Sequence, residues 1–346
     1  MSAGRGDLPP AVRVAPPGPR SRELSRRIAA AEAPGINTLA GDAPSLFWQE
    51  AVGANVVDVD GNRFLDLASG FGVAAVGHRH PRVVAAVEAQ SRRLLHGLGD
   101  VHPHPLRVEL AERLAAVAPV AAGPAGKRVF FGISGAEAVE IAVKTAVLAT
   151  GRAGVVAFEP SYHGLTAGAL ALSSRPAFRG PFAAHLHPHV TRLPYGGPAD
   201  AVAARLAADD VAAVVVEPIV GREGVLPPPP GWLPALAAAC REHGTLLVAD
   251  EVFTGFGRTG RLFAVQHEGV EPDLLVVGKA LGGGLPIAAV VAAAETMAAW
   301  RGEGEALHTA TFVAHPLACA AALAVLEVLE AESLPARAAA RGPVLA

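Results

Sequence analysis

The stretch Lys127–Thr150, KRVFFGISGAEAVEIAVKTAVLAT, decides the fold because a short apolar run passes directly into a helical pattern. KRVFFGIS has the composition of a buried strand, and the residues after it repeat apolar side chains at helical spacing. Four further short, β-branched runs follow, at 154–159, 211–220, 245–253 and 273–278. Apolar strands that alternate with helices predict an α/β fold with a mostly parallel sheet covered by helices on both faces.

The composition limits the class of protein. The 346 residues are 51% hydrophobic and 18% charged, which is enough apolar material for a large core. A net charge of −3 gives no reason to expect a nucleic-acid or membrane partner. No run reaches the roughly 18 apolar residues of a membrane span. The proline-rich start has no secretory signal pattern, and two cysteines, Cys240 and Cys319, favour a reducing, cytoplasmic location.

The chain length predicts about two domains. We interpret residues 1–35 as a flexible N-terminal arm. Residues 36–70 form an N-terminal segment with two short strands around the Asp60-Gly61-Asn62 turn. Residues 71–312 form the large domain that binds the ligand. Residues 313–346 contain a linking helix and the start of a shortened C-terminal domain.

Polar residues follow three of the predicted strands, at the sheet edge where α/β proteins bind ligands. The first group is Ser134, Gly135 and Ala136, which open the helix after the first strand. Free N–H groups, the helix dipole and the Ser134 hydroxyl suit a phosphate, and Gly135 allows the backbone to approach closely. The alternative is an ordinary helix cap in which Glu137 completes a capping box.

The second strand end carries Asp250, which follows four apolar residues and is therefore expected to be buried. A buried carboxylate needs a cationic or hydrogen-bonding partner. That partner is either the protonated ring nitrogen of a pyridine cofactor or an arginine such as Arg258.

The third strand end carries Lys279, one of only three lysines beside Lys127 and Lys144, although lysine and arginine together number 29. Desolvation disfavours a charged ammonium, and the neutral amine attacks carbonyl groups. Arginine cannot do this because it stays protonated. The alternative is a surface lysine with a buried stem.

Together these three groups offer a phosphate site, a buried acid and a nucleophilic amine, which is the set that a pyridoxal phosphate enzyme needs. A dinucleotide site is disfavoured because no glycine-rich turn has the strand and acidic residue that it requires. We expect no metal site, since no cysteine or carboxylate completes the histidines of HLHPH at 185–189.

The chain resembles the class III pyridoxal-phosphate aminotransferases, which include ornithine, 4-aminobutyrate and ω-amino acid transaminases. The resemblance covers about residues 36–335. It rests on the ordered motifs VVDVDGNRFLDLASGFGVAAVGHRHP, ISGAEAVEIAVKTA, SYHG, VVVEPI, VADEVFTGFGRTG, DLLVVGKALGGGLPIAAVV and TATFVAHPLACAAALA. It implies fold type I with a mostly parallel, seven-stranded type of sheet. It further implies pyridoxal 5'-phosphate as cofactor, an amine or amino acid donor, a keto acid acceptor, and a homodimer with shared sites.

The resemblance also implies roles for single residues. Lys279 forms the internal aldimine and moves the proton between the substrate and the cofactor. Asp250 keeps the pyridine nitrogen protonated. Val252 packs on one face of the ring and Tyr162 stacks on the other, with His163 beside it.

Further roles follow from the same resemblance. Ser134, Gly135 and Ala136 bind the phosphate, and Thr311 reaches the phosphate of the neighbouring subunit. Glu217 contributes to the cofactor and substrate side, where related enzymes use a glutamate to hold a substrate-binding arginine. Three aromatic residues are expected to shape the substrate pocket: Phe47, Trp48 and Phe71.

The sequence departs from the family at several points. Ala136 removes a frequent phosphate-binding hydroxyl, Phe253 replaces a frequent glutamine, and Ala314 replaces a frequent glycine. The chain ends at ARAAARGPVLA, whereas relatives continue into a small domain that supplies a substrate-binding arginine. We therefore expect a truncated gene product, a fragment of a longer chain, or a chain that borrows the missing part.

Three hypotheses remain open. The first is an aminotransferase acting on an amine or ω-amino acid through Lys279. The second is an aminomutase or racemase of the same fold, because these reactions use the same lysine and aspartate. The third is a truncated, non-catalytic aminotransferase-like protein. The amino donor and acceptor stay unassigned.

Overall fold

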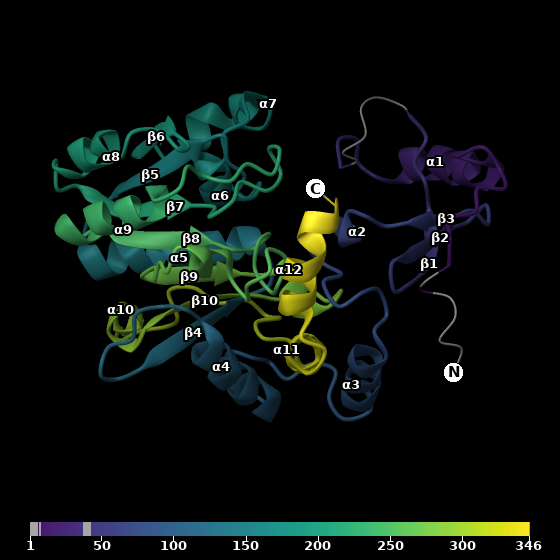
Figure 1. Cartoon of the computed structure of the whole chain (residues 1–346). Helices are drawn as coiled ribbons and strands as arrows, with labels where there is room; N and C mark the ends of the chain where they lie inside the picture. Colours follow the sequence, from purple (N-terminus) through teal and green to yellow (C-terminus); the bar gives the residue numbers. More distant parts are fainter. Residues whose placement is uncertain (1–5, 7, 37–42, 346) are drawn as a thin grey trace.

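A computed structural model describes residues 6, 8–36 and 43–345. Predictions for residues 1–5, 7, 37–42 and 346 lie outside this part of the chain. In Figure 1 a large sheet with helices occupies one side, and a small sheet with helix α1 occupies the other. The small sheet holds β1 (Trp48–Val52), β2 (Asn55–Asp58) and β3 (Arg63–Leu65). The large sheet holds β4 (Lys127–Gly132), β5 (Gly154–Glu159), β6 (Val190–Pro194), β7 (Val211–Val216), β8 (Leu246–Asp250), β9 (Leu274–Val277) and β10 (Ala288–Ala293).

The large sheet has seven strands in the order β4-β10-β9-β8-β7-β5-β6. The pairs β6–β5, β5–β7, β7–β8 and β8–β9 are parallel, whereas β10 runs antiparallel to both of its neighbours, β4 and β9. The predicted α/β fold with a mostly parallel sheet is confirmed. Each of the five predicted apolar runs contains a strand. The strands β6 and β10 were not predicted, because VTRLP mixes polar and apolar residues and AAVVAA lies in a longer apolar run.

The helices lie on both faces of the large sheet and around the small one (Figure 1). Their bounds are α1 Pro19–Ala31, α2 Ser69–Gly72, α3 Pro81–Ser91, α4 Pro105–Val117, α5 Gly135–Thr150, α6 Ala167–Leu172, α7 Pro176–Arg179, α8 Ala199–Leu206, α9 Trp232–Glu242, α10 Ala294–Met297, α11 Pro316–Ala331 and α12 Leu334–Leu345. Four short 3-10 helices are η1 Gly180–His185, η2 Ala264–His267, η3 Lys279–Gly282 and η4 Ala298–Trp300.

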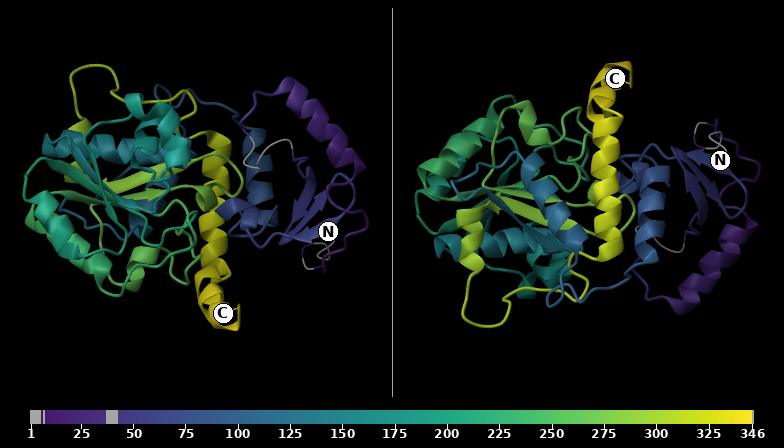
Figure 2. Two further views of the ribbon diagram at one scale, coloured as in Figure 1. Left: turned by 90° about the horizontal axis from the view of Figure 1, so that it is seen from above. Right: turned by 90° about the horizontal axis from the view of Figure 1, so that it is seen from below.

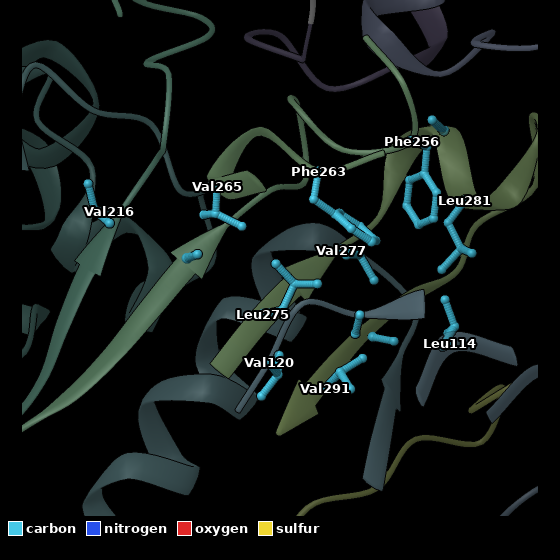
Figure 3. Close-up of a cluster of buried hydrophobic side chains, with 14 of the residues drawn as sticks. Leu114, Val120, Val216, Phe256, Phe263, Val265, Leu275, Val277, Leu281 and Val291 are labelled. Carbon is cyan, nitrogen blue, oxygen red and sulfur yellow. The ribbon is translucent and has the colours of Figure 1, made fainter. Parts of the chain in front are cut away.

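The core forms two layers because neighbouring residues of a strand point to opposite faces of the sheet. On β9, Leu275 and Val277 join one cluster, whereas Leu274 and Val276 join the other. Figure 3 shows part of the first cluster, which includes Phe263, Leu275, Val277 and Val291. This cluster includes residues of α4, α9 and α11, while the second is covered by α5 and α6. Strands buried on both faces explain why their sequences are continuous apolar runs.

Within residues 1–35, interpreted above as an N-terminal arm, Pro19–Ala31 forms helix α1, which was not predicted. Both views of Figure 2 show α1 beside the small sheet and away from the large one. The Asp60 carboxylate accepts hydrogen bonds from the backbone N–H groups of Arg20 and Ser21, at 2.8 and 3.0 Å. A carboxylate 40 positions along the chain thus caps the helix, and a local sequence pattern does not reveal such a cap.

Two general features complete the fold. Within residues 6, 8–36 and 43–345, no helix has both the length and the apolar character needed to cross a bilayer. Cys240 and Cys319 are free and buried, and burial raises the pKa of the Cys319 thiol to about 12. The predicted domain boundaries at 35, 70 and 312 stay predictions.

Candidate functional site

Most of the predicted site residues lie where strands of the large sheet end. Strands β5, β7, β8 and β9 are parallel neighbours, so the residues after them meet at one edge. A cavity of about 240 Å³ lies there. It is lined by Gly135, Ala136, Tyr162, His163, Gly164, Leu165, Glu217, Arg222, Asp250, Val252, Phe253 and Lys279.

Asp250 forms a buried pair with His163. The Asp250 Oδ2 atom lies 2.7 Å from His163 Nδ1, and its Oδ1 atom accepts the Val252 N–H at 3.1 Å. Burial lowers the pKa of His163, but the hydrogen bond and charge of Asp250 outweigh this effect and raise it. His163 Nε2 is buried and has no hydrogen-bond partner among the described residues. The Asp250 partner is therefore His163, and the alternative of an Arg258 pair is wrong.

Lys279 begins the 3-10 helix η3 with a φ of 42°, a left-handed conformation that is strained for a residue with a side chain. Its Nζ atom lies 4.6 Å from the centre of the Phe253 ring and 5.7 Å from that of Phe71. Burial lowers the pKa of Lys279, and the Arg258 and Arg222 charges act in the same direction, against those of Asp250 and Glu217. A lysine held in this way loses its proton more readily than a surface lysine.

The other two lysines have ordinary partners. Lys127 Nζ donates a hydrogen bond to the Ala118 carbonyl oxygen over 2.6 Å, and Lys144 Nζ lies 3.1 Å from His308 Nδ1. Only Lys279 of the three lines the cavity. Lys279 is therefore not the surface lysine that the alternative interpretation predicted.

The start of α5 shows the helix cap that was one of the two interpretations of its sequence. Ser134 caps the helix, since its hydroxyl oxygen accepts the Glu137 N–H at 3.2 Å. The Glu137 carboxylate accepts the Ile133 N–H at 2.6 Å rather than the N–H of Ser134, so the capping box is shifted by one residue. Gly135 lies against Val252, because an added Cβ would lie 2.8 Å from Val252 Cγ1. The Ser134 hydroxyl proton remains available to an anion.

Glu217 is buried, and both of its carboxylate oxygens accept backbone hydrogen bonds. The donors are the N–H groups of Tyr162, at 2.8 Å, and Gly221, at 3.0 Å. Burial raises the pKa of the Glu217 carboxyl despite these bonds. Glu217 therefore fixes the backbone beside Tyr162 and the turn that follows β7.

The predicted aromatic residues of the substrate pocket are only partly brought together. Phe71 lies near Lys279 through a left-handed turn with a φ of 59°. Trp48 is on β1 and contacts the His78 ring edge-on at 5.9 Å, and neither it nor Phe47 is among the cavity-lining residues. Thr311 is exposed and does not line the cavity either.

Several features of the site were not predicted from the sequence. The His163–Asp250 pair joins residues 87 positions apart. The Asp66 carboxylate lies 2.7 Å from His78 Nε2 and accepts the Gly70 N–H at 2.6 Å, which fixes the turn that carries Phe71. Arg222 gave no signal because the chain has many arginines. Ala314, at a φ of 48°, holds a conformation that favours the glycine of relatives.

The sheet, the site at its edge and the strained lysine define a pyridoxal-phosphate protein of fold type I. Residues 38–346 match the family model described as Aminotransferase class-III, and the chain belongs to that family. The predicted family is confirmed. The putrescine aminotransferase of Pectobacterium atrosepticum is 43% identical over 320 residues, which cover 89% of this chain and 66% of that protein. The chain thus spans just under two thirds of this relative's length.

Solved structures of aminotransferases have the same fold as this chain. The ornithine aminotransferase of Toxoplasma gondii aligns with a TM-score of 0.84 and 31% identity, over 93% of this chain and 74% of the other. The PLP-bound amine transaminase of an uncultivated Pseudomonas species aligns with a TM-score of 0.80 and 32% identity, over 91% of this chain and 77% of the other. The (S)-enantioselective ω-transaminase of Thermomicrobium roseum aligns with a TM-score of 0.83 and 31% identity, over 93% of this chain and 77% of the other.

The residues of the cavity fit pyridoxal 5'-phosphate. The helix N-terminus at Ser134 and Gly135 suits the phosphate. The buried Asp250 carboxylate suits a protonated ring nitrogen, and the desolvated Lys279 amine suits the carbonyl group. The predicted cofactor is confirmed for the family to which the chain belongs.

Proposed function

We propose that this chain transfers an amino group from an amine or ω-amino acid to a keto acid with pyridoxal 5'-phosphate in its cavity. One observation carries the proposal: a desolvated Lys279 and a buried Asp250–His163 pair line the same cavity. Its membership of the aminotransferase family supports the same reaction.

Lys279 holds and moves the proton in this proposal. Because burial lowers its pKa, the Lys279 amine loses its proton more readily than that of a surface lysine. The neutral amine can attack the carbonyl group or accept a proton from the substrate carbon. When bound, the cofactor supplies a conjugated ring that accepts the electron pair left on that carbon. The left-handed backbone of Lys279 directs the side chain toward Phe253 and Phe71.

Asp250 supplies the negative charge that keeps a ring nitrogen protonated. Its two other hydrogen bonds, to His163 and to the Val252 N–H, fix its orientation before a ligand binds. Fixed charges of this kind cost little reorganisation during a reaction. Tyr162 and Val252 both line the cavity, and we assign them to the two faces of the ring.

The remaining assignments belong to the same proposal. Ser134, Gly135 and Ala136 bind the phosphate, and Thr311 binds the phosphate of a second subunit in a homodimer. The exposure of Thr311 outside the cavity supports a role in a neighbouring site. A cytoplasmic location is proposed on the cysteine content alone.

The test is reconstitution of the full chain with pyridoxal 5'-phosphate, followed by borohydride reduction and mass spectrometry. We expect the cofactor mass on the Lys279 peptide and the formation of a new amine from a keto acid. Retention of the donor nitrogen within a rearranged or inverted donor would instead indicate an aminomutase or racemase. Failure to attach the cofactor to Lys279 would contradict the proposal and favour the non-catalytic hypothesis.

A further inference from the structure

One cation of the cavity has no part in the reaction described above. Arg222 follows the turn after β7 and lines the cavity together with Lys279. The turn is fixed on both sides. Glu217 accepts the Gly221 N–H, and a Cβ added to Gly221 would lie 2.5 Å from the Phe253 ring. Arg222 is therefore attached to a rigid point of the site.

Aromatic rings surround the Arg222 guanidinium. Its Cζ atom lies 4.5 Å from the centre of the Tyr162 ring, 5.4 Å from that of Phe178 and 5.7 Å from that of Phe71. Such contacts hold a guanidinium in place without neutralising it.

No carboxylate of the described chain lies within 4.0 Å of this guanidinium. The neighbouring Glu223 carboxylate is bound instead to Arg175, whose Nε atom lies 2.8 Å away. Glu217 is occupied by two backbone N–H groups. Arg222 thus brings a positive charge without a directly paired carboxylate among the described residues to the wall of the cavity. A ligand in the cavity is exposed to that charge.

The chemistry of a guanidinium selects the ligand. Its planar set of N–H donors binds a carboxylate through two parallel hydrogen bonds. The same charge repels an ammonium group, and like charges that face each other across a binding site are strongly unfavourable. A substrate with a carboxylate far from its amino group is favoured, and a diamine is disfavoured.

We propose that Arg222 binds the substrate carboxylate, so that this cavity selects ω-amino acids and keto acids over diamines. The inference rests on the proposed aminotransferase function and adds the class of substrate to it. It differs from the activity for which the putrescine aminotransferase relative is named, because putrescine is a diamine.

The experiment compares two amines of similar length on the reconstituted full chain. These are 4-aminobutyrate, which ends in a carboxylate, and putrescine, which ends in a second amine. The variants are Arg222→Gln, which removes the charge, and Arg222→Lys, which keeps it. Arg179→Gln is the matched control, because Arg179 pairs with Glu159 outside the cavity lining.

We expect the wild type to react faster with 4-aminobutyrate than with putrescine. Single-turnover experiments that monitor the absorbance of the cofactor measure both rates. Arg222→Gln should raise KM for 4-aminobutyrate about 10- to 100-fold with little change in kcat. It should reverse the preference toward putrescine. Arg222→Lys should recover part of the affinity, and Arg179→Gln should behave like the wild type.

A second readout needs no reaction. The dissociation constant of glutarate, measured by calorimetry, should rise by a similar factor in Arg222→Gln. A wild type that prefers putrescine, or an Arg222→Gln variant with unchanged glutarate affinity, overturns the proposal. A wild type that binds the cofactor and reacts with neither amine contradicts the aminotransferase function, and the glutarate titration still decides the role of Arg222.

Discussion

His163 Nδ1 lies 2.7 Å from Asp250 Oδ2, and both side chains are buried. This pair connects the segment after β5 with the end of β8. The other carboxylate oxygen, Oδ1, accepts the Val252 N–H at 3.1 Å. The acid proposed to face the ring nitrogen is therefore oriented from two sides.

The variant Asp250→Asn tests this orientation. An amide keeps the shape but loses the charge, so turnover should fall by about 10²-fold or more while the cofactor still attaches to Lys279. Steady-state kinetics and borohydride trapping measure the two effects separately. Asp273→Asn is the control, because the partly buried Asp273 carboxylate accepts the Leu247 N–H at the far end of β8, away from the cavity. Normal turnover of Asp250→Asn would remove Asp250 from this role.

Lys279→Arg separates charge from nucleophilicity. The guanidinium keeps the positive charge but does not deprotonate, so turnover should fall about 10²- to 10⁴-fold. Borohydride should fix no cofactor to the variant protein. The matched control is Lys144→Arg on the surface of α5, which should keep full activity. A Lys279→Arg variant that still traps the cofactor would show that another amine reacts.

The desolvated Lys279 predicts a pH dependence of stability. The pKa of Lys279 is lower in the folded chain than the value of 10.5 expected when unfolded, so the unfolded chain binds more protons between these two values. Lys279 therefore reduces stability at neutral pH, and this cost disappears as the pH rises toward 10.5.

Without cofactor, Lys279→Met should therefore raise the melting temperature by a few degrees at pH 7. The gain over wild type should shrink as the pH rises, and thermal denaturation at several pH values measures it. A gain that grows with pH would contradict the assignment of a desolvated amine.

Gly221→Ala tests the close contact between the turn after β7 and Phe253. The added methyl group would lie 2.5 Å from the Phe253 ring, so the turn has to move. We expect a loss of about 1–3 kcal/mol in unfolding free energy and weaker carboxylate binding. Gly302→Ala is the control, because nothing lies within 4 Å of its added Cβ. Equal stability of both variants in urea denaturation would show that the turn is flexible.

The residues at strand ends could be predicted because the pattern that forms the sheet also fixes where its edge lies. Apolar runs located β8 and β9, and the same runs located Asp250 and Lys279. The composition contributed independently, since a lysine among many arginines indicates that an amine is required.

Other features depend on contacts between distant segments. The antiparallel direction of β10 follows from its pairing with β4, and AAVVAA has no pattern of its own that reveals a direction. Helix α1 depends on a cap from Asp60. The role inferred for Arg222 depends on the fact that the nearby carboxylates Glu217 and Glu223 bind other groups. The sequence does not show these contacts.

Helix α11 shares one core with the strands of the large sheet. Val325, Leu326 and Leu329 are buried in the same cluster as Leu275 and Val277, and the helix contacts both α3 and α4. The cluster cannot close before residues 316–331 have left the ribosome. During synthesis, the apolar face of the sheet therefore stays exposed until residues 316–331 have emerged, and exposed apolar surface of this kind is prone to aggregation.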